Sequence, residues 1–269
     1  MRLTVIQGGA DPGIEPATHP SHPATELWLE LADPALRVRI SVWLAGLTTS
    51  VRERALTDLE PLVAAGVRTE EQFVDAISPA TPAALAIAVC RLAGTAGDAD
   101  VAGPRLRRVL ADASCARVRV TAAQAIARLG GVEARGALAE ALIRDDDEEV
   151  RARAARGLGQ LRDHRAVPVL GATLANPGEL PAVRGEAAEA LGVIGRRSAV
   201  AVLLRALRDT EPDVRAGAAM ALGMLGGLEV LPALRGLTGD HAMTSELGPV
   251  SECAAAAIAD VQRRGMRTG

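Results

Sequence analysis

The stretch EEVRARAARGLGQLRDHRAVPVLGATLAN, residues 148–176, decides the fold. It opens with acids and a Val-Arg pair, runs through small residues to Leu-Gly-Gln-Leu, breaks at a polar segment and ends in a second apolar run. Apolar residues stand 0, 4, 8 and 11 positions from Val150, which places them on one face of an α-helix. The stretch therefore predicts a helix, a tight turn and a second helix.

The same unit recurs along the chain. Seven copies align on the Val150 position, and their first helices begin near residues 36, 81, 118, 150, 183, 214 and 250. The copies that begin between 118 and 214 are spaced by 31 to 33 residues, and a small residue returns nine positions after each start. A two-helix unit that repeats with this period predicts an all-α solenoid, in which neighbouring helices approach closely at the small residues.

The ends of the chain depart from the repeat. Residues 1–24 are rich in Pro and Gly and are predicted to form a flexible lead, whereas residues 25–269 are predicted to form a single solenoid. An insert at 66–81 predicts an extra helix before the second copy, and the last copy contains a first helix only.

One copy carries a recognisable family signature. The string EPDVRAGAAMALGMLG at residues 211–226, followed shortly by LEVLPALRGL, resembles the short HEAT-like repeat of the phycobilisome-lyase type. The resemblance covers roughly residues 33–264. It implies a right-handed α-solenoid of about seven helix-turn-helix HEAT-like repeats, with the second helices lining a concave face. The motif is specific for this fold and says little about activity.

Composition narrows the possible functions. The chain has 269 residues, is 49% hydrophobic but only 1% aromatic, and carries a net charge of -3. This balance argues against wholesale coating of nucleic acid, which favours strongly basic domains. Three dispersed cysteines make no disulfide framework. Because no apolar run reaches the ~20 residues of a membrane span and no signal-like run opens the chain, a cytoplasmic location is expected.

A search for catalytic motifs finds no complete set. The four histidines form no HExxH motif and no His-Glu pair, and the chain contains no lysine for a phosphate-binding loop or a Schiff base. HEAT-like di-iron hydroxylases carry His-Glu dipeptides, so that activity is not expected here. His19 and His22 could bind a metal in the lead, but a plain linker is favoured. No cofactor and no metal site are predicted.

Three further residues allow two interpretations each. Cys115 precedes a first helix close to arginines, a setting that lowers a thiol pKa, although a small turn residue is the favoured reading. Glu186 and Glu189 share a helix face and could serve acid–base chemistry. A solvated face beside Arg184 is the favoured alternative for this pair.

Arginines recur in two sets. One set follows the aligned Val and is predicted to form a ladder between repeats, although an anion-binding row is the alternative: Arg119, Arg151, Arg184 and Arg215. The second set lies on or before the second helices and predicts a basic concave groove, with plain solvated surface as the alternative: Arg105, Arg108, Arg135, Arg165, Arg197, Arg205, Arg208 and Arg235. A groove of one sign attracts partners of the other sign.

These observations lead to a functional prediction. We expect a non-catalytic protein-binding scaffold or adaptor that presents the Arg-lined surface to an acidic protein partner. Two alternatives stay open: a bilin or cofactor lyase-like enzyme subunit, which the family resemblance implies, and a phosphate-backbone binder. Nucleic acid is the less favoured partner because the groove lacks aromatic side chains for base stacking.

Overall fold

The protein is an α-solenoid in a computed structural model that describes residues 70–75, 77, 81, 83–96 and 98–266. Every regular element among these residues is a helix, so the all-α prediction is confirmed. The predicted lead at 1–24, its boundary with the solenoid and the copy that begins near 36 lie outside the described residues.

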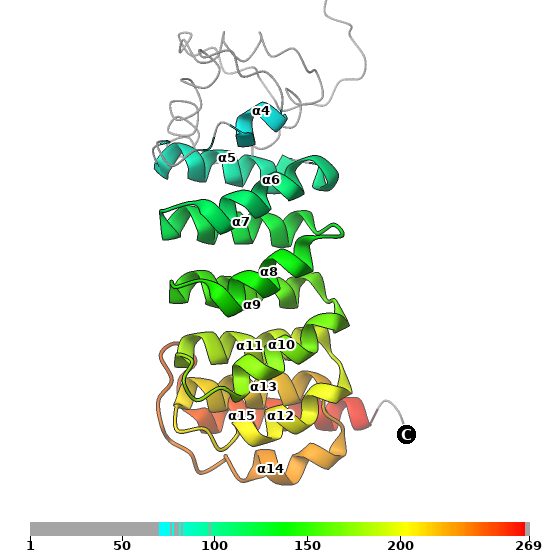
Figure 1. The fold of residues 1–269 in the computed structure, drawn as a ribbon. Helices are drawn as coiled ribbons and strands as arrows, with labels where there is room; N and C mark the ends of the chain where they lie inside the picture. Colours follow the sequence, from blue (N-terminus) through cyan, green and yellow to red (C-terminus); the bar gives the residue numbers. More distant parts are fainter. Residues whose placement is uncertain (1–69, 76, 78–80, 82, 97, 267–269) are drawn as a thin grey trace, which may run out of the picture.

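Two layers of helices build the solenoid (Figure 1). The first helices of the repeats pack side by side in one layer: α5 (Ala83–Ala96), α7 (Ala116–Leu129), α9 (Glu148–Leu161), α11 (Pro181–Ile194), α13 (Pro212–Leu225) and α15 (Val250–Gly265). The second helices form the other layer: α6 (Ala99–Asp112), α8 (Ala134–Arg144), α10 (Val167–Ala175), α12 (Val200–Ala206) and α14 (Leu231–Arg235). The extra helix that the insert predicts appears as α4 (Glu70–Asp75), which packs against α5 and α6.

Local sequence signals set the helix ends. The Asp147 carboxylate accepts hydrogen bonds from the backbone N–H groups of Glu149 and Val150, which caps α9. Pro181 and Pro212 begin α11 and α13, where a missing N–H removes no helical hydrogen bond. Gly195 ends α11 in the left-handed region at a φ of 72°. Short 3₁₀ turns lead into α10, α12 and α14: η1 (His164–Ala166), η2 (Arg197–Ala199) and η3 (Leu228–Val230).

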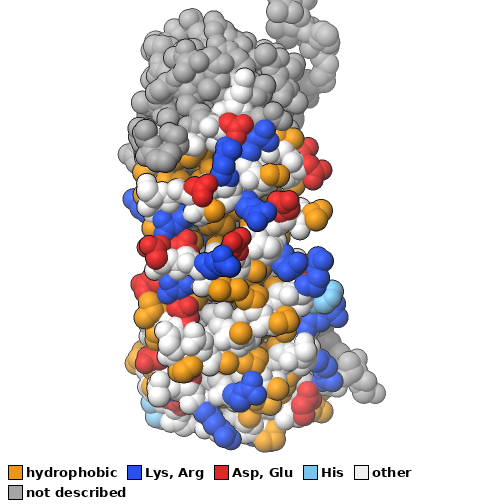
Figure 2. All heavy atoms as spheres, viewed as in Figure 1, with side chains coloured by type: hydrophobic (Ala, Val, Ile, Leu, Met, Phe, Trp, Pro, Cys, Tyr) orange, Lys and Arg blue, Asp and Glu red, His pale blue; other side chains and the backbone are white. Residues whose placement is uncertain are grey.

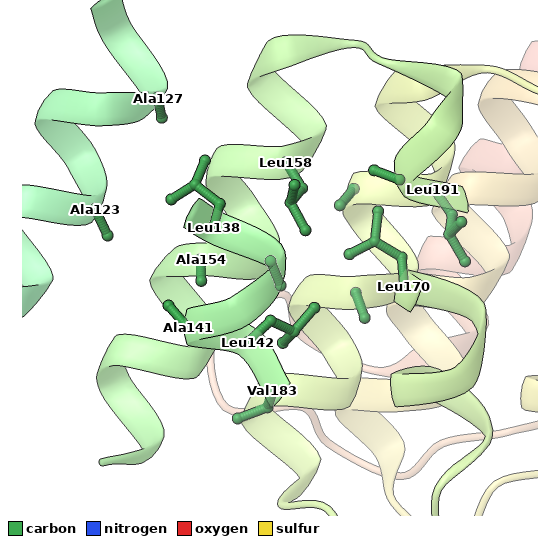
Figure 3. Close-up of a cluster of buried hydrophobic side chains, with 14 of the residues drawn as sticks. Ala123, Ala127, Leu138, Ala141, Leu142, Ala154, Leu158, Leu170, Val183 and Leu191 are labelled. Atoms are coloured by element: carbon green, nitrogen blue, oxygen red, sulfur yellow. The ribbon is translucent and has the colours of Figure 1, made fainter. Parts of the chain in front are cut away.

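The core lies between the two layers. Leu138 and Leu170 of the second helices and Leu158 and Leu191 of the first helices are fully buried. Figure 3 shows these leucines between the helices, with Ala154 and other small side chains beside them. Burial of each such side chain contributes about 1.5–3 kcal/mol to stability. Because every repeat supplies some of them, the core is distributed along the stack.

Close backbone contacts hold the first-helix layer together. A Cβ atom added at Gly159 would lie 2.9 Å from Cα of Ala190 in the next repeat. Gly192 stands in the same way against Ala221, and Gly223 against Ala257. Glycine is therefore required at these positions by the approach of the neighbouring helix, as the recurring small residue predicted.

A loop joins α14 to α15 over residues 239–249. Its tip is closed by hydrogen bonds that the Thr244 N–H and hydroxyl donate to the carbonyl of Gly248. The N–H and hydroxyl of Ser245 both donate to Oδ1 of Asp213, near the start of α13. These bonds fasten the loop onto the first-helix layer at α13, the helix that packs directly against α11.

Candidate functional site

The arginines that follow the aligned Val connect successive repeats. Arg151 of α9 donates from Nε and Nη2 to the two oxygens of Glu179, at 3.0 and 2.8 Å, in the turn before α11. Arg119 reaches Asp145 from α7 by two bonds of 2.8 Å. Each guanidinium also donates to carbonyls of the turn that precedes its own helix, such as the 2.9 Å bond from Arg151 to Asp145.

The same arrangement continues in the two following repeats. Arg184 pairs with Asp209, and Arg215 donates from Nε to Asp240 at 2.7 Å. Arg184 is only 6% exposed, so its charge is held almost entirely by this pair and by the carbonyl of Glu179. Planar guanidinium groups suit such two-pronged contacts with carboxylates.

These contacts lower the pKa of acids in the turns. Burial alone would raise the pKa of Glu179, but hydrogen bonds from Arg151 and from the N–H of Leu180 lower it below its ordinary value. For Asp240, the hydrogen bond from Arg215 is the main cause of a lowered pKa. The ionised forms are therefore the stable ones in the folded protein.

The arginines of the second-helix layer fall into two groups. Five of the eight residues predicted to line a groove are paired with acids: Arg105 and Arg108 with Asp75, Arg135 and Arg165 with Asp163, and Arg197 with Glu229. The side chains of Arg205, Arg208 and Arg235 have no acidic partner among the described residues. On the face in Figure 2, basic and acidic side chains alternate over the upper repeats, and apolar surface separates the few charges below. Whether these arginines bind a partner stays a prediction.

A different group of charges lies on the first-helix layer. Glu186 of α11 accepts a hydrogen bond of 2.9 Å from Nε of Arg156 on α9. Glu189, one turn further along α11, is half-buried and has no hydrogen-bond partner among the described residues. Glu246, at the tip of the loop, acts electrostatically on Glu189 and on Arg156. We call Glu186, Glu189 and Glu246 the carboxylate cluster.

The carboxylate cluster has an excess of negative charge. Burial raises the pKa of Glu189, the neighbouring Glu186 raises it further, Arg156 opposes the rise and Glu246 adds to it. One arginine therefore faces three carboxylates. Glu186 and Glu189 are both half-buried, but only Glu186 forms an ion pair with that arginine. Such an arrangement favours either a proton or a positively charged group at Glu189.

Sequence reasoning found two members of this cluster and missed the third. The i, i+3 spacing of Glu186 and Glu189 predicts a shared helix face. Glu246 is separated from them by more than fifty residues and is brought back by the loop that Ser245 and Asp213 fasten. The lengthened spacing of 36 residues before the last copy is the signal that marks this loop.

The three cysteines differ in their surroundings. Burial raises the pKa of the Cys90 thiol to about 12 and also raises that of Cys253, which suits packing residues. Cys115 is half-exposed before α7 and borders a surface cavity of about 420 Å³ together with Arg108 and Asp112. None of the three forms a disulfide.

Metal-binding groups and membrane-spanning helices are both absent from the described residues. No group of three or more His, Cys, Asp or Glu side chains within the described part of the chain is arranged to hold a metal ion. No helix in that part is long and apolar enough to cross a membrane.

Comparison with known proteins identifies the family. A family model described as HEAT repeats matches residues 103–180 and 174–243, more than half of the chain. The chain is a HEAT-repeat protein. Deoxyhypusine hydroxylase of Mus musculus is 42% identical over 127 residues, which are 45% of this chain and 40% of the mouse enzyme. The chain thus matches about two fifths of the length of this curated relative.

Two solved structures are similar to this chain at lower sequence identity. Human deoxyhypusine hydroxylase in complex with glycerol has a TM-score of 0.43 and 23% identity, over 76% of this chain and 96% of that chain. The complex of CpcE and CpcF of phycocyanin lyase from Nostoc has a TM-score of 0.44 and 18% identity, over 94% of this chain and 100% of that chain.

The relatives correct the functional prediction made from the sequence. A non-catalytic scaffold or adaptor is the wrong description, because curated relatives at about 42% identity are enzymes. The error has a physical reason: the repeated positions describe helix packing, which is the same in HEAT-repeat enzymes and scaffolds. Surface groups that carry chemistry do not follow the repeat, so the repeat motif is silent about them.

Proposed function

We propose that this HEAT-repeat chain belongs to a protein-modifying enzyme and binds the cationic side chain of a modified lysine at its carboxylate cluster. The observation that carries the proposal is the 42% identity with deoxyhypusine hydroxylase. The relative's name specifies an enzyme that acts on deoxyhypusine. Because the match covers 40% of the relative, we infer a role in the same kind of reaction and not the relative's complete activity.

The chemistry of such a side chain fits the cluster. Deoxyhypusine is a lysine extended by an aminobutyl group, so it presents two amines that are protonated at neutral pH. Ammonium groups are bound in proteins by carboxylates in partly desolvated surroundings. Glu186 and Glu189 are both half-buried. Glu186 is occupied by Arg156, whereas Glu189 has no ion pair of its own. An ammonium group at Glu189 would balance the excess negative charge.

A metal-dependent oxidation step does not fit these residues. The HEAT-like di-iron hydroxylases hold their metal on His-Glu dipeptides, and this sequence contains no such dipeptide. The described histidines, His164 and His241, belong to no metal-binding group in the described part of the chain. We therefore assign substrate binding to this chain and derive no oxidation step from it.

Three further expectations from the sequence concern the lyase resemblance, the cellular location and the binding partner. The finer resemblance to the phycobilisome-lyase repeat favours no second function, since the curated relative reported above is a hydroxylase. The cytoplasmic location stays a prediction, and so does the preference for an acidic protein partner at Arg205 and Arg208.

Calorimetry with a modified peptide tests the proposal. The ligand is a short peptide that carries N-(4-aminobutyl)lysine, and the reference ligand is the same peptide with its side-chain amines acetylated. We expect binding of the amine form only, and at least a tenfold loss of affinity in Glu189→Gln, since a charged hydrogen bond contributes about 1.5–3 kcal/mol. Glu140→Gln on α8 removes the same charge from the other layer and should bind normally. Equal affinity of wild type and Glu189→Gln would refute the assignment.

A further inference from the structure

The last helix exposes a surface that is covered in every inner repeat. Within the first-helix layer, the residue nine positions after the aligned Val packs on the following first helix: Gly159 on Ala190, Gly192 on Ala221 and Gly223 on Ala257. Ala259 of α15 stands at this same position. Within the described part of the chain it is exposed.

Four exposed residues define the outer face of α15. Glu252, Ala256, Ala259 and Arg263 follow one another at steps of four, three and four residues, so they lie along one side of the helix. The two central residues are small, and the ends carry opposite charges. We call these four residues the end face.

We propose that the end face binds the end face of a second copy of this chain, with the two α15 helices antiparallel about a two-fold axis. The steps of four, three and four read the same in both directions. An antiparallel pairing therefore sets Glu252 of one copy opposite Arg263 of the other, twice, and Ala256 opposite Ala259, twice. A two-fold interface of this kind uses the same patch on both subunits.

Two features of the end face favour a second copy as the occupant. First, the end face continues the helix-to-helix interface of the repeats, which already accepts small residues at Ala259's position. Second, its charges complement themselves in the antiparallel arrangement and repel in a parallel one. Arg263 pairs with Asp260 one turn away, at a site where its side chain is 71% exposed. Exposed pairs of this kind contribute little, so Arg263 can exchange partners.

The size of the surface sets the expected strength. One pair of helices buries less than the ~1,000 Å² that a stable interface usually requires. The dimer should therefore form at high protein concentration and dissociate on dilution. Its charged pairs lie at the rim of a small interface, so high salt should shift it toward the monomer.

Sedimentation velocity over a hundredfold range of concentration tests the inference on the full chain. We expect a monomer at the lowest concentration and a dimer at the highest. Glu252→Arg alone and Arg263→Glu alone should each remain monomeric, because like charges then meet across the axis. Glu140→Arg, an exposed reversal on α8, should dimerise as the wild type does.

Mixing the two single variants gives a decisive control. A copy with Glu252→Arg and a copy with Arg263→Glu are complementary at both charged pairs, so an equimolar mixture should form a heterodimer. A wild type that stays monomeric at every concentration would overturn the proposal. So would variants that dimerise normally, or a mixture of folded variants that remains monomeric.

Discussion

Two glutamates in or beside the first-helix layer have pKa values shifted in opposite directions. Arg151 and Glu179 meet as a matched pair, and the pKa of Glu179 falls below its ordinary value. Glu189 lies on the same layer but faces other carboxylates, and its pKa rises. The first arrangement stabilises the fold, whereas the second stores unfavourable charge that a cationic ligand can relieve. Residues that bind or react often carry such perturbations.

Replacing Glu189 should stabilise the free protein. Because its folded pKa is raised above the ordinary 4.5, the folded state holds the proton more tightly, and ionisation lowers stability as pH rises past this value. At pH 7, Glu189→Gln should therefore raise the free energy of unfolding by roughly 0.5 kcal/mol, measured by denaturant titration. The difference from wild type should vanish below pH 4, where the carboxyl is protonated in both states. A variant less stable than wild type at pH 7 would contradict the charge excess at this residue.

Removing Arg151 should have the opposite effect and destabilise the protein. Breaking a mostly buried pair by deleting one partner costs about 3 kcal/mol. Because the pKa of Glu179 is lowered in the folded protein, its share of stability is present above its ordinary pKa and is lost as pH falls. Urea titrations of Arg151→Met between pH 7 and pH 3 should show a smaller acid-dependent loss than wild type. Arg144→Met, at an exposed pair, serves as the control and should change stability little.

The contrast between the two arginine sets shows what the sequence could predict. The position of the ladder arginines follows from the repeat, but the separation between each arginine and its acid varies between 25 and 28 residues. The acids are Asp145, Glu179, Asp209 and Asp240. For the second-helix set, counting acids on the helices overstated the basic surface. The neutralising groups Asp75 and Asp163 come from α4 and from a turn, and only the folded chain brings them close.

At the scale of helices, the packing of the first-helix layer follows from size. Glycine and alanine recur where neighbouring backbones meet, so helix register could be derived from the sequence pattern. Ala188, at such a position, is fully buried as the pattern requires. The loop at 239–249 could not be derived, because its course depends on contacts between residues that are distant in the sequence: Ser245 with Asp213, and Asp240 with Arg215. The carboxylate cluster depends on the course of this loop.

Two glycine-to-alanine changes should distinguish the effect of a close helix contact on stability from the effect of helix propensity. At Gly192, the new Cβ would lie 2.8 Å from Cα of Ala221, so Gly192→Ala should cost about 1–3 kcal/mol through overpacking. At Gly136 of α8 nothing lies within 4 Å, and Gly136→Ala should stabilise the helix by about 0.5–1 kcal/mol. Thermal unfolding of both variants measures the difference. If the two changes had the same sign, the register of the first-helix layer would be wrong.

Releasing the loop should weaken ligand binding more than stability. Asp213→Ala removes the acceptor of both Ser245 bonds and leaves the hydrogen bonds of the loop tip in place. Glu246 would then no longer be held near Glu189, so affinity for the amine-bearing peptide should fall severalfold. Unfolding should shift by less than about 1 kcal/mol, as expected for exposed hydrogen bonds. Unchanged affinity in a folded Asp213→Ala protein would show that Glu246 has no part in the site.

At the scale of the whole molecule, the solenoid separates stability from function. Each repeat contacts its neighbours only, so the core and the arginine ladder are distributed along the stack. The all-α solenoid could be predicted because its signal is repeated in every copy. The carboxylate cluster occurs once, between one helix pair and one loop, and therefore left no repeated signal. This difference explains why family membership follows from the sequence more readily than activity does.

The most direct test of the account is the pKa of Glu189 with and without ligand, measured by carbon NMR on the labelled side-chain carboxyl. We predict a pKa above 4.5 in the free protein and a fall on saturation with the N-(4-aminobutyl)lysine peptide, because an ammonium group stabilises the ionised carboxylate. The acetylated peptide should leave the value unchanged. A Glu189 pKa that does not move when the amine peptide is bound would contradict the central claim, since the cation would then lie elsewhere.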